Sequence, residues 1–279
     1  MMTRRQMTQM KKIESPETLL EMAENEENLQ DALWFAKRAR HLDPNNLDAE
    51  RIIAGLSAED DAKLLRRYEA LIARGDLWME EHGYMAQKHF GHYWEIPETQ
   101  PYVRLRFSYC WLLYDMGIFR RAIVEAEELL WLCAADTPLD VRGLLLTLYA
   151  LLGETEKAET LCAGAETEDS LSFLPLSVLY FREGNLRAAR SCIQTMLRID
   201  PGIAQLYTNL GPQITHNDLD IEEETDGPLP YTGFTYELFM MTMQYIHLYL
   251  NTPAYFLWGY YEIQSILNGE KKKEAKNAS

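Results

Sequence analysis

The sequence has 279 residues, of which 47% are hydrophobic, and its 43 acidic and 27 basic side chains give a formal net charge of −16. This hydrophobic fraction, together with only 15 Gly and 11 Pro, is typical of a packed protein and excludes a wholly disordered or collagen-like chain. The negative charge argues against a nucleic-acid partner, because binding to phosphates normally depends on clustered Lys and Arg.

The apolar runs, the N-terminal sequence and the cysteine spacing indicate where in the cell the protein is located. The longest nearly unbroken apolar run, residues 144–152, is far shorter than the roughly 20 residues that cross a bilayer, so no membrane span is expected. The N-terminus lacks the apolar segment of a secretory signal. The cysteines lie far apart and form no C-x-x-C pair, which argues against a zinc site and a disulfide framework. We therefore expect a cytoplasmic protein with reduced cysteines, no metal and no other cofactor. The cysteines are Cys110, Cys133, Cys162 and Cys192.

The first third of the chain predicts helices flanked by a short tail. Residues 1–12 are expected to be disordered, and residues 13–100 to contain N-terminal helices followed by a junction. A helical pattern of small residues ends at Leu42-Asp43-Pro44, where the proline stops the helix. Residues 58–82 are rich in charge and are interpreted as two further helices.

Residues 101–201 contain three similar segments, each with a Gly, then four residues, then an Ala. The glycines are Gly117, Gly153 and Gly184, and the alanines are Ala122, Ala158 and Ala189. Their spacings of 36 and 31 residues bracket the roughly 34-residue period of a helix–turn–helix repeat. We expect each Gly to adopt the left-handed backbone at the end of a first helix. Each Ala then lets a second helix pack closely against the first, so three helix pairs are predicted.

The last third combines acidic and aromatic sequence. Residues 202–230 predict a short helix and an acidic loop, which we interpret as a solvated spacer rather than a docking site for a basic partner. Residues 231–270 are aromatic and apolar at helical spacing and predict capping helices, with Pro253 opening the second one. Residues 271–279 form a polar tail that is expected to be disordered.

These helix pairs resemble tetratricopeptide repeats, in which antiparallel helix pairs stack into a right-handed solenoid that serves as a protein-binding scaffold. When the segments are aligned on their loop glycines, the small position of the first helix falls on Cys110, Leu146 and Ser177. Leu146 departs from the pattern. The resemblance covers about residues 13–57 and 101–201, and it implies an all-α fold built as a tetratricopeptide-like solenoid.

The junction carries a second resemblance. Residues 91–104, with the sequence GHYWEIPETQPYVR, resemble a junction in bacterial tetratricopeptide proteins related to the suppressor of tumorigenicity seven family. An Arg commonly stands in that family where this chain has Gln100. The resemblance implies no defined biochemical activity.

The helix around residues 104–115 carries two stripes. Leu105, Tyr109, Leu112 and Met116 form a core stripe. A second stripe consists of Arg104, Phe107, Trp111 and Tyr114. The resemblance implies that this second stripe faces the concave groove, so we expect its four side chains to contact a protein or peptide segment. Arg106 and Arg142 are expected to be available for an acidic group. The alternative is that neighbouring helices cover the aromatic rings.

No nucleophile or phosphate-binding motif supports catalysis, so the predicted function is a noncatalytic scaffold with an unidentified protein partner. One alternative is a metal-dependent enzyme that uses His82, His89 and His92. His89 and His92 have a spacing that reaches one ion on a helix, but the H-E-x-x-H motif is missing. Another alternative is a structural homo-oligomer assembled through the C-terminal aromatic helices, although such stripes normally pack inward. The aromatic residues concerned are Tyr245, Tyr249, Phe256, Trp258, Tyr260 and Tyr261.

Overall fold

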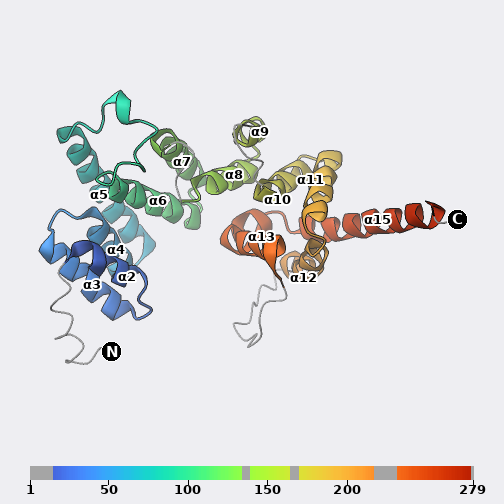
Figure 1. The fold of residues 1–279 in the computed structure, drawn as a ribbon, viewed down its shortest axis with the longest axis horizontal. Helices are drawn as coiled ribbons and strands as arrows, with labels where there is room; N and C mark the ends of the chain where they lie inside the picture. Colours follow the sequence, from blue (N-terminus) through green and yellow to red (C-terminus); the bar gives the residue numbers. More distant parts are fainter. Residues whose placement is uncertain (1–14, 134–138, 164–169, 217–230, 278–279) are drawn as a thin grey trace. The chain divides into compact units, whose positions relative to one another are not determined.

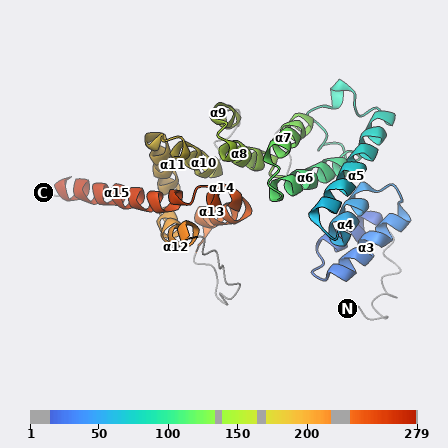
Figure 2. The same cartoon turned by 180° about the vertical axis from the view of Figure 1, so that it is seen from behind.

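The computed structural model describes residues 15–133, 139–163, 170–216 and 231–277, with no account of the side chains of residues 212–216 and 270–277. Within these residues the chain forms α-helices and short 3₁₀ helices and no β-strand, which confirms the predicted all-α class. The predicted disordered N-terminus and the predicted acidic loop, apart from its first residues, lie outside the described part of the chain. Helix contacts divide the molecule into two units, residues 1–141 and 142–279 (Figures 1 and 2).

The first unit is a succession of helices in which each packs against the next. Its α-helices are α2 (Pro16–Glu24), α3 (Leu29–Leu42), α4 (Leu47–Ser57), α5 (Asp61–Glu81), α6 (Gln100–Asp115) and α7 (Phe119–Cys133). The starts of α2 to α5 follow from local chemistry, because a polar side chain accepts a hydrogen bond from a first-turn N–H group in each case. These caps are Ser15, Asn28, Asn46 and Asp60. In addition, α4 contacts both α2 and α6.

The prediction of two helices in residues 58–82 is wrong, because α5 is one continuous helix of 21 residues. The position that invites a break is Gly75, which is buried inside α5. A Cβ atom at Gly75 would lie only 2.7 Å from Cδ2 of Tyr102 on α6. This glycine therefore permits close helix packing and does not end the helix.

The three Gly–Ala segments adopt the same local structure, as the sequence predicts. Gly117, Gly153 and Gly184 have φ angles of +73°, +74° and +77°. After each glycine the next N–H group donates to the carbonyl five residues earlier, at 2.8–2.9 Å, which is the hydrogen bond that ends a helix in this motif. The alanines five positions later are completely buried. They are Ala122, Ala158 and Ala189.

Two of these helix pairs share a further contact. In the first, the Cys110 thiol lies 3.3 Å from the Ala122 carbonyl oxygen, and in the third the Ser177 hydroxyl donates to the Ala189 carbonyl at 3.0 Å. Leu146 at the same position of the middle pair has no such group and is buried. The small polar residue therefore links the two helices where it is present.

The second unit contains the middle and last helix pairs and the C-terminal helices. Its helices are α8 (Val141–Leu152), which begins at the unit boundary, α9 (Thr155–Ala163), η3 (Ser170–Ser172), α10 (Phe173–Arg182), α11 (Leu186–Ile199), α12 (Ile203–His216), α13 (Gly233–Gln244), α14 (Ile246–Leu250) and α15 (Ala254–Asn277). The main packing partners are α10 with α11 and α12 with α15. The second helix of the middle pair, α9, has only 9 residues.

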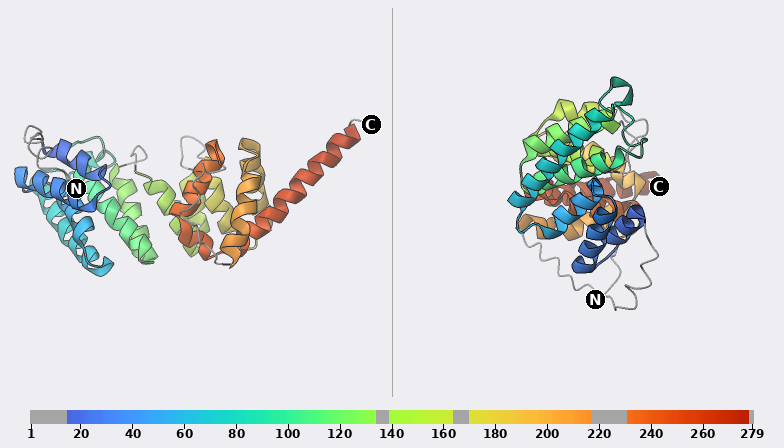
Figure 3. Two further views of the ribbon diagram at one scale, coloured as in Figure 1. Left: turned by 90° about the horizontal axis from the view of Figure 1, so that it is seen from below. Right: turned by 90° about the vertical axis from the view of Figure 1, so that its left-hand side faces the viewer.

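The C-terminal aromatic residues pack mainly inward. Tyr245, Tyr249, Tyr255 and Phe256 are fully buried, whereas Tyr261 is exposed. The capping interpretation accounts for the buried rings, and of the surface proposed for the homo-oligomer alternative only Trp258, Tyr260 and Tyr261 remain partly or fully exposed. Helix α15 continues to Asn277 beyond the helices that it contacts (Figure 3). The polar sequence expected to be a disordered tail is therefore helical over residues 271–277, where Lys, Glu and Ala favour a helix.

Candidate protein-binding face

Helix α6 leaves only a narrow stripe accessible in the first unit. Most of its residues are buried, whereas Arg104, Phe107 and Trp111 are partly exposed and Asp115 is exposed. Tyr114, the predicted fourth member of this stripe, is only 1% exposed. The helical repeat of 3.6 residues explains the difference, because the stripe continues from Trp111 by four residues instead of three. We call Arg104, Phe107 and Trp111 the α6 stripe.

The aromatic members of the α6 stripe contact one another. The ring centroids of Phe107 and Trp111 lie 6.2 Å apart in an edge-to-face arrangement. The ring of Trp111 contacts that of the buried Tyr114 in the same way, at 5.5 Å. Tyr114 therefore supports the stripe from inside and does not belong to its surface.

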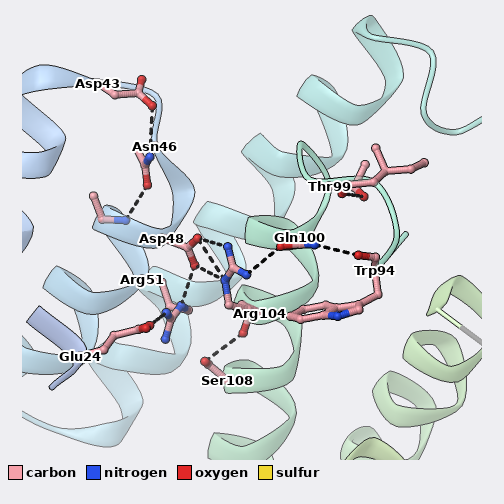
Figure 4. Close-up of polar contacts among 12 residues, drawn as sticks. Glu24, Asp43, Asn46, Asp48, Arg51, Trp94, Thr99, Gln100, Arg104 and Ser108 are labelled. Carbon is pink, nitrogen blue, oxygen red and sulfur yellow. Dashed lines mark hydrogen bonds and ion pairs between the residues drawn. The ribbon is translucent and has the colours of Figure 1, made fainter. Parts of the chain in front are cut away.

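Arg104 connects α6 to α4 (Figure 4). Its Nε atom donates to Oδ1 of Asp48 at 2.9 Å, and its Nη2 atom donates to Oδ2 at 2.5 Å. Asp48 lies in the first turn of α4 and is buried. A guanidinium held by two parallel bonds to one carboxylate has a fixed plane. The side chain of Arg104 is thus oriented before any ligand binds.

The Asp48 carboxylate also accepts a hydrogen bond from a second arginine, which lies on its own helix. Arg51 Nε donates to Oδ1 of Asp48 at 3.3 Å, and the Arg51 guanidinium also pairs with Glu24 on α2. Burial opposes the charge of Arg104, but the hydrogen bonds and negative charge of Asp48 outweigh it and raise the pKa of Arg104. One chain of charges therefore crosses α2, α4 and α6.

The junction before α6 supports Arg104 from the other side. The guanidinium carbon of Arg104 lies 5.7 Å from the ring centroid of Trp94, within the range of a cation–π contact. Gln100 donates from Nε2 to the Trp94 carbonyl at 2.8 Å, and its Oε1 atom accepts from Arg104 at 3.4 Å. Gln100 therefore links Arg104 to the junction.

The junction itself is fixed by backbone contacts. The N–H groups of Gly91 and Tyr93 both donate to the carbonyl of Leu132 on α7, at 2.9 and 3.1 Å. The buried Thr99 hydroxyl binds the carbonyls of Tyr93 and Ile96. Trp94 is held in place between these anchors.

The expectation that Arg106 is available for a ligand is wrong, because this residue is 5% exposed and fully engaged. Its Nη2 atom donates to Glu125 at 3.0 Å and to Glu128 at 2.6 Å, both on α7. Its Nη1 atom also donates to the Tyr102 hydroxyl at 3.2 Å. The hydrogen bond from Arg106 lowers the pKa of Glu128. Arg106 therefore joins α6 to α7 inside the unit.

Arg142 is also engaged, and it belongs to the second unit. It lies at the start of α8, and its guanidinium donates to the backbone carbonyl of Leu161 on α9. The structure thus brings together Arg104, Phe107 and Trp111 of the predicted set. Arg106 and Arg142 hold helix pairs together instead.

The three histidines of the metal-site alternative do not converge. His82 contacts the Trp78 carbonyl at 2.8 Å, the His89 ring packs edge-to-face on Tyr84, and His92 lies 3.1 Å from Glu95. The parts of the chain that the structure describes contain no group of three or more His, Cys, Asp or Glu side chains that suits a metal ion. The described residues therefore do not form the cluster that the metal-site alternative requires.

No described helix has both the length and the apolarity to cross a bilayer.

Comparison with known proteins adds no assignment to this geometry. Neither a protein-family model nor a curated protein matches the sequence.

The sequence did not predict the roles of three residues at this face, Asp48, Arg51 and Trp94. No local pattern points to Asp48, because its partner Arg104 lies 56 residues away. Trp94 lies in the junction, residues 91–104, whose sequence resembles that of bacterial tetratricopeptide proteins. This resemblance was the one sequence feature that pointed to Trp94.

Proposed function

We propose that this chain is a noncatalytic cytoplasmic scaffold that binds a protein segment along α2, α4 and α6. The observation that carries the proposal is the α6 stripe, where an arginine and two aromatic rings remain partly exposed on a helix whose other residues are mostly buried. Arg, Trp and other aromatic residues are enriched where proteins bind one another. A rigid aromatic surface also loses little conformational entropy when a partner binds.

The arrangement of helices supports a tetratricopeptide-like solenoid. Helix α4 contacts both α2 and α6, the helices two places before and after it, in addition to its sequential neighbours. The equivalent turns at Gly117, Gly153 and Gly184 supply the repeated helix pair. In such a solenoid the first helices of successive pairs line the groove, and the face of α2, α4 and α6 takes this place.

The contacts assign different roles within the α6 stripe. Arg104 is already paired with Asp48, so it offers a flat, oriented guanidinium plane for stacking and not an unsatisfied charge. Phe107 and Trp111 offer apolar ring surface. The partner segment should therefore present aromatic or aliphatic side chains to this face.

The test is the double variant Phe107→Ala with Trp111→Ala, used as bait in affinity purification from the native cell with quantitative mass spectrometry. The chain offers a matched control in Phe90→Ala with Trp131→Ala. That pair also joins one Phe and one Trp, with centroids 4.0 Å apart, and Trp131 is 56% exposed. We expect partners to be lost with the first variant and kept with the second. Unchanged partners on a folded Phe107/Trp111 variant would contradict the proposal.

A further inference from the structure

A groove in the first unit gathers three arginines on a chain whose net charge is −16. Its volume is about 470 Å³, and α3, α4 and α5 line it. Its charged residues are Arg40 on α3, Glu50 on α4, and Arg67 and Arg74 on α5. The groove is therefore locally positive.

The groove also has an apolar part to its lining. This part consists of Ile53 and Ala54 on α4 and of Ala70 and Leu71 on α5. Both pairs lie on the same faces of their helices as the charged residues, at spacings of three or four residues. The two alanines leave space between the helices, and Ile53 and Leu71 supply aliphatic surface.

The arginines retain hydrogen-bonding capacity. The Nη1 atoms of Arg40 and Arg74 lie 3.5 and 3.8 Å from the Glu50 carboxylate, beyond ordinary hydrogen-bond lengths. Arg67 donates one bond of 2.9 Å to the Ser57 hydroxyl. Because each guanidinium has five N–H donors, most donors around the groove are not used by the described residues. The side chains of Arg40 and Arg74 are 43% and 44% exposed, so a ligand can reach them.

This groove is separate from the α6 stripe. A rotation of 100° per residue places Glu50, Ile53 and Ala54 on the side of α4 that faces away from Asp48, the carboxylate that holds Arg104. Substitutions in the groove therefore leave the contacts of Arg104 in place.

We propose that the groove binds an acidic peptide segment. Its carboxylates pair with the guanidinium groups of Arg40, Arg67 and Arg74, and an aliphatic side chain rests on Ile53 and Leu71. We choose an acidic peptide as the ligand because of charge complementarity: a guanidinium binds a carboxylate through two parallel hydrogen bonds. Arg67 and Arg74 are two helical turns apart, roughly 10 Å. About three residues of an extended peptide span this distance, so two acidic side chains of one segment reach both arginines.

The test measures binding of a fluorescently labelled peptide that repeats Glu-Leu-Glu, by fluorescence anisotropy with the full chain. A peptide that repeats Gln-Leu-Gln has the same size and no charge. We expect the acidic peptide to bind and the neutral one not to bind. Arg67→Gln with Arg74→Gln should weaken binding by at least about tenfold, because two charge-assisted pairs are lost. Arg120→Gln with Arg187→Gln changes the net charge equally at exposed positions outside the groove and should have little effect.

A second variant separates binding from folding. Ala70 is an exposed residue in the lining of the groove, so Ala70→Phe fills the groove without changing its charge and should abolish binding. Equal weakening in the Arg120/Arg187 control, unchanged binding to Ala70→Phe, or binding of the neutral peptide would each overturn the proposal. Displacement of the peptide by inorganic phosphate at the peptide's own concentration would also overturn it, because the site would then select any anion. None of these outcomes depends on Phe107 or Trp111.

Discussion

The two units hold their helices together with different chemistry. In the first, a buried guanidinium joins α6 to α7, because Arg106 binds Glu125 and Glu128. In the second, aromatic rings join α12 to α15, and the buried hydroxyl groups of Tyr207 and Tyr255 share a hydrogen bond of 2.6 Å. Besides its apolar core, the first unit thus has a buried ion pair between helices, and the second has a closely packed contact between large rings.

The two kinds of contact are sensitive to different substitutions. Removing one member of a buried ion pair leaves the other charged group in a poorly solvated place, which costs more than the pair itself contributes. A closely packed aromatic contact tolerates little added volume, because protein interiors are already dense. The second unit also has the pair Arg190–Glu262 between α11 and α15, but Arg190 is more than one third exposed. Such a surface pair contributes little.

The largest effect is expected from Arg106→Met. The change keeps an unbranched apolar stem but removes the guanidinium, and it leaves Glu125, which is 9% exposed, without its partner. We expect the free energy of unfolding to fall by about 3–5 kcal/mol, measured by urea denaturation. The matched control is Arg121→Met, which removes a pair with Glu69 in which both side chains are about half exposed. That change should lower the free energy of unfolding by about 0–1 kcal/mol.

Equal effects of the two arginine substitutions would mean that burial of Arg106 does not raise the energetic importance of its ion pairs. A double variant, Arg106→Met with Glu125→Leu, tests the cause of the loss. If the cost comes from an unpaired buried carboxylate, removing that carboxylate should restore part of the lost stability.

In the second unit, Gly259→Ala tests the fit of the rings. Gly259 lies on α15, and a Cβ atom there would overlap the Tyr207 ring, with Cδ1 only 2.6 Å away. We expect the free energy of unfolding to fall by about 1–3 kcal/mol. Gly269 lies on the same helix with no atom near its Cβ position, so Gly269→Ala should stabilise the protein by up to about 1 kcal/mol through helix propensity. Destabilisation by both changes would show that helix packing at Tyr207 is not the cause.

Local features of the fold were predictable from sequence because they depend on backbone geometry. Only glycine enters the left-handed region readily, so the turns at Gly117, Gly153 and Gly184 follow from the residues alone. The ends of α3 and α11 follow for a similar reason. Asp43 and Asp200 precede proline and take an extended backbone. In both, the backbone N–H group donates the last helical hydrogen bond to the carbonyl four residues earlier.

The roles of the two arginines on α6 were not predictable in this way. Arg104 and Arg106 stand two positions apart on one helix, yet one is partly exposed and the other is buried. Their partners decide the difference, because Asp48 comes from α4 and Glu125 from α7. Helix spacing alone also allows either Tyr114 or Asp115 to follow Trp111 on the exposed side of α6. Packing of neighbouring helices selects between them, and no single-helix pattern contains that information.

The smallest expected effect concerns a carboxylate in the aromatic second unit. The Asp200 side chain at the end of α11 accepts hydrogen bonds from the Thr235 hydroxyl at 2.6 Å and the Thr235 N–H group at 3.1 Å. These bonds, the hydroxyl bond first, lower the pKa of Asp200. A carboxyl with a lowered pKa stabilises the folded state above its ordinary pKa of about 3.9, and this contribution is lost as the pH falls through the folded-state value.

Thr235→Val should therefore lower the free energy of unfolding by about 1 kcal/mol at neutral pH. The difference from the unsubstituted protein should shrink as the pH falls below about 4, because Asp200 then becomes protonated in both proteins. Urea denaturation at several pH values measures this difference. Thr208→Val is the control, since the Thr208 hydroxyl donates to the Ala204 carbonyl within α12 and its effect should not vary with pH. A Thr235→Val effect that stays constant down to pH values below about 3 would show that steric fit, and not the carboxylate contact, accounts for the loss.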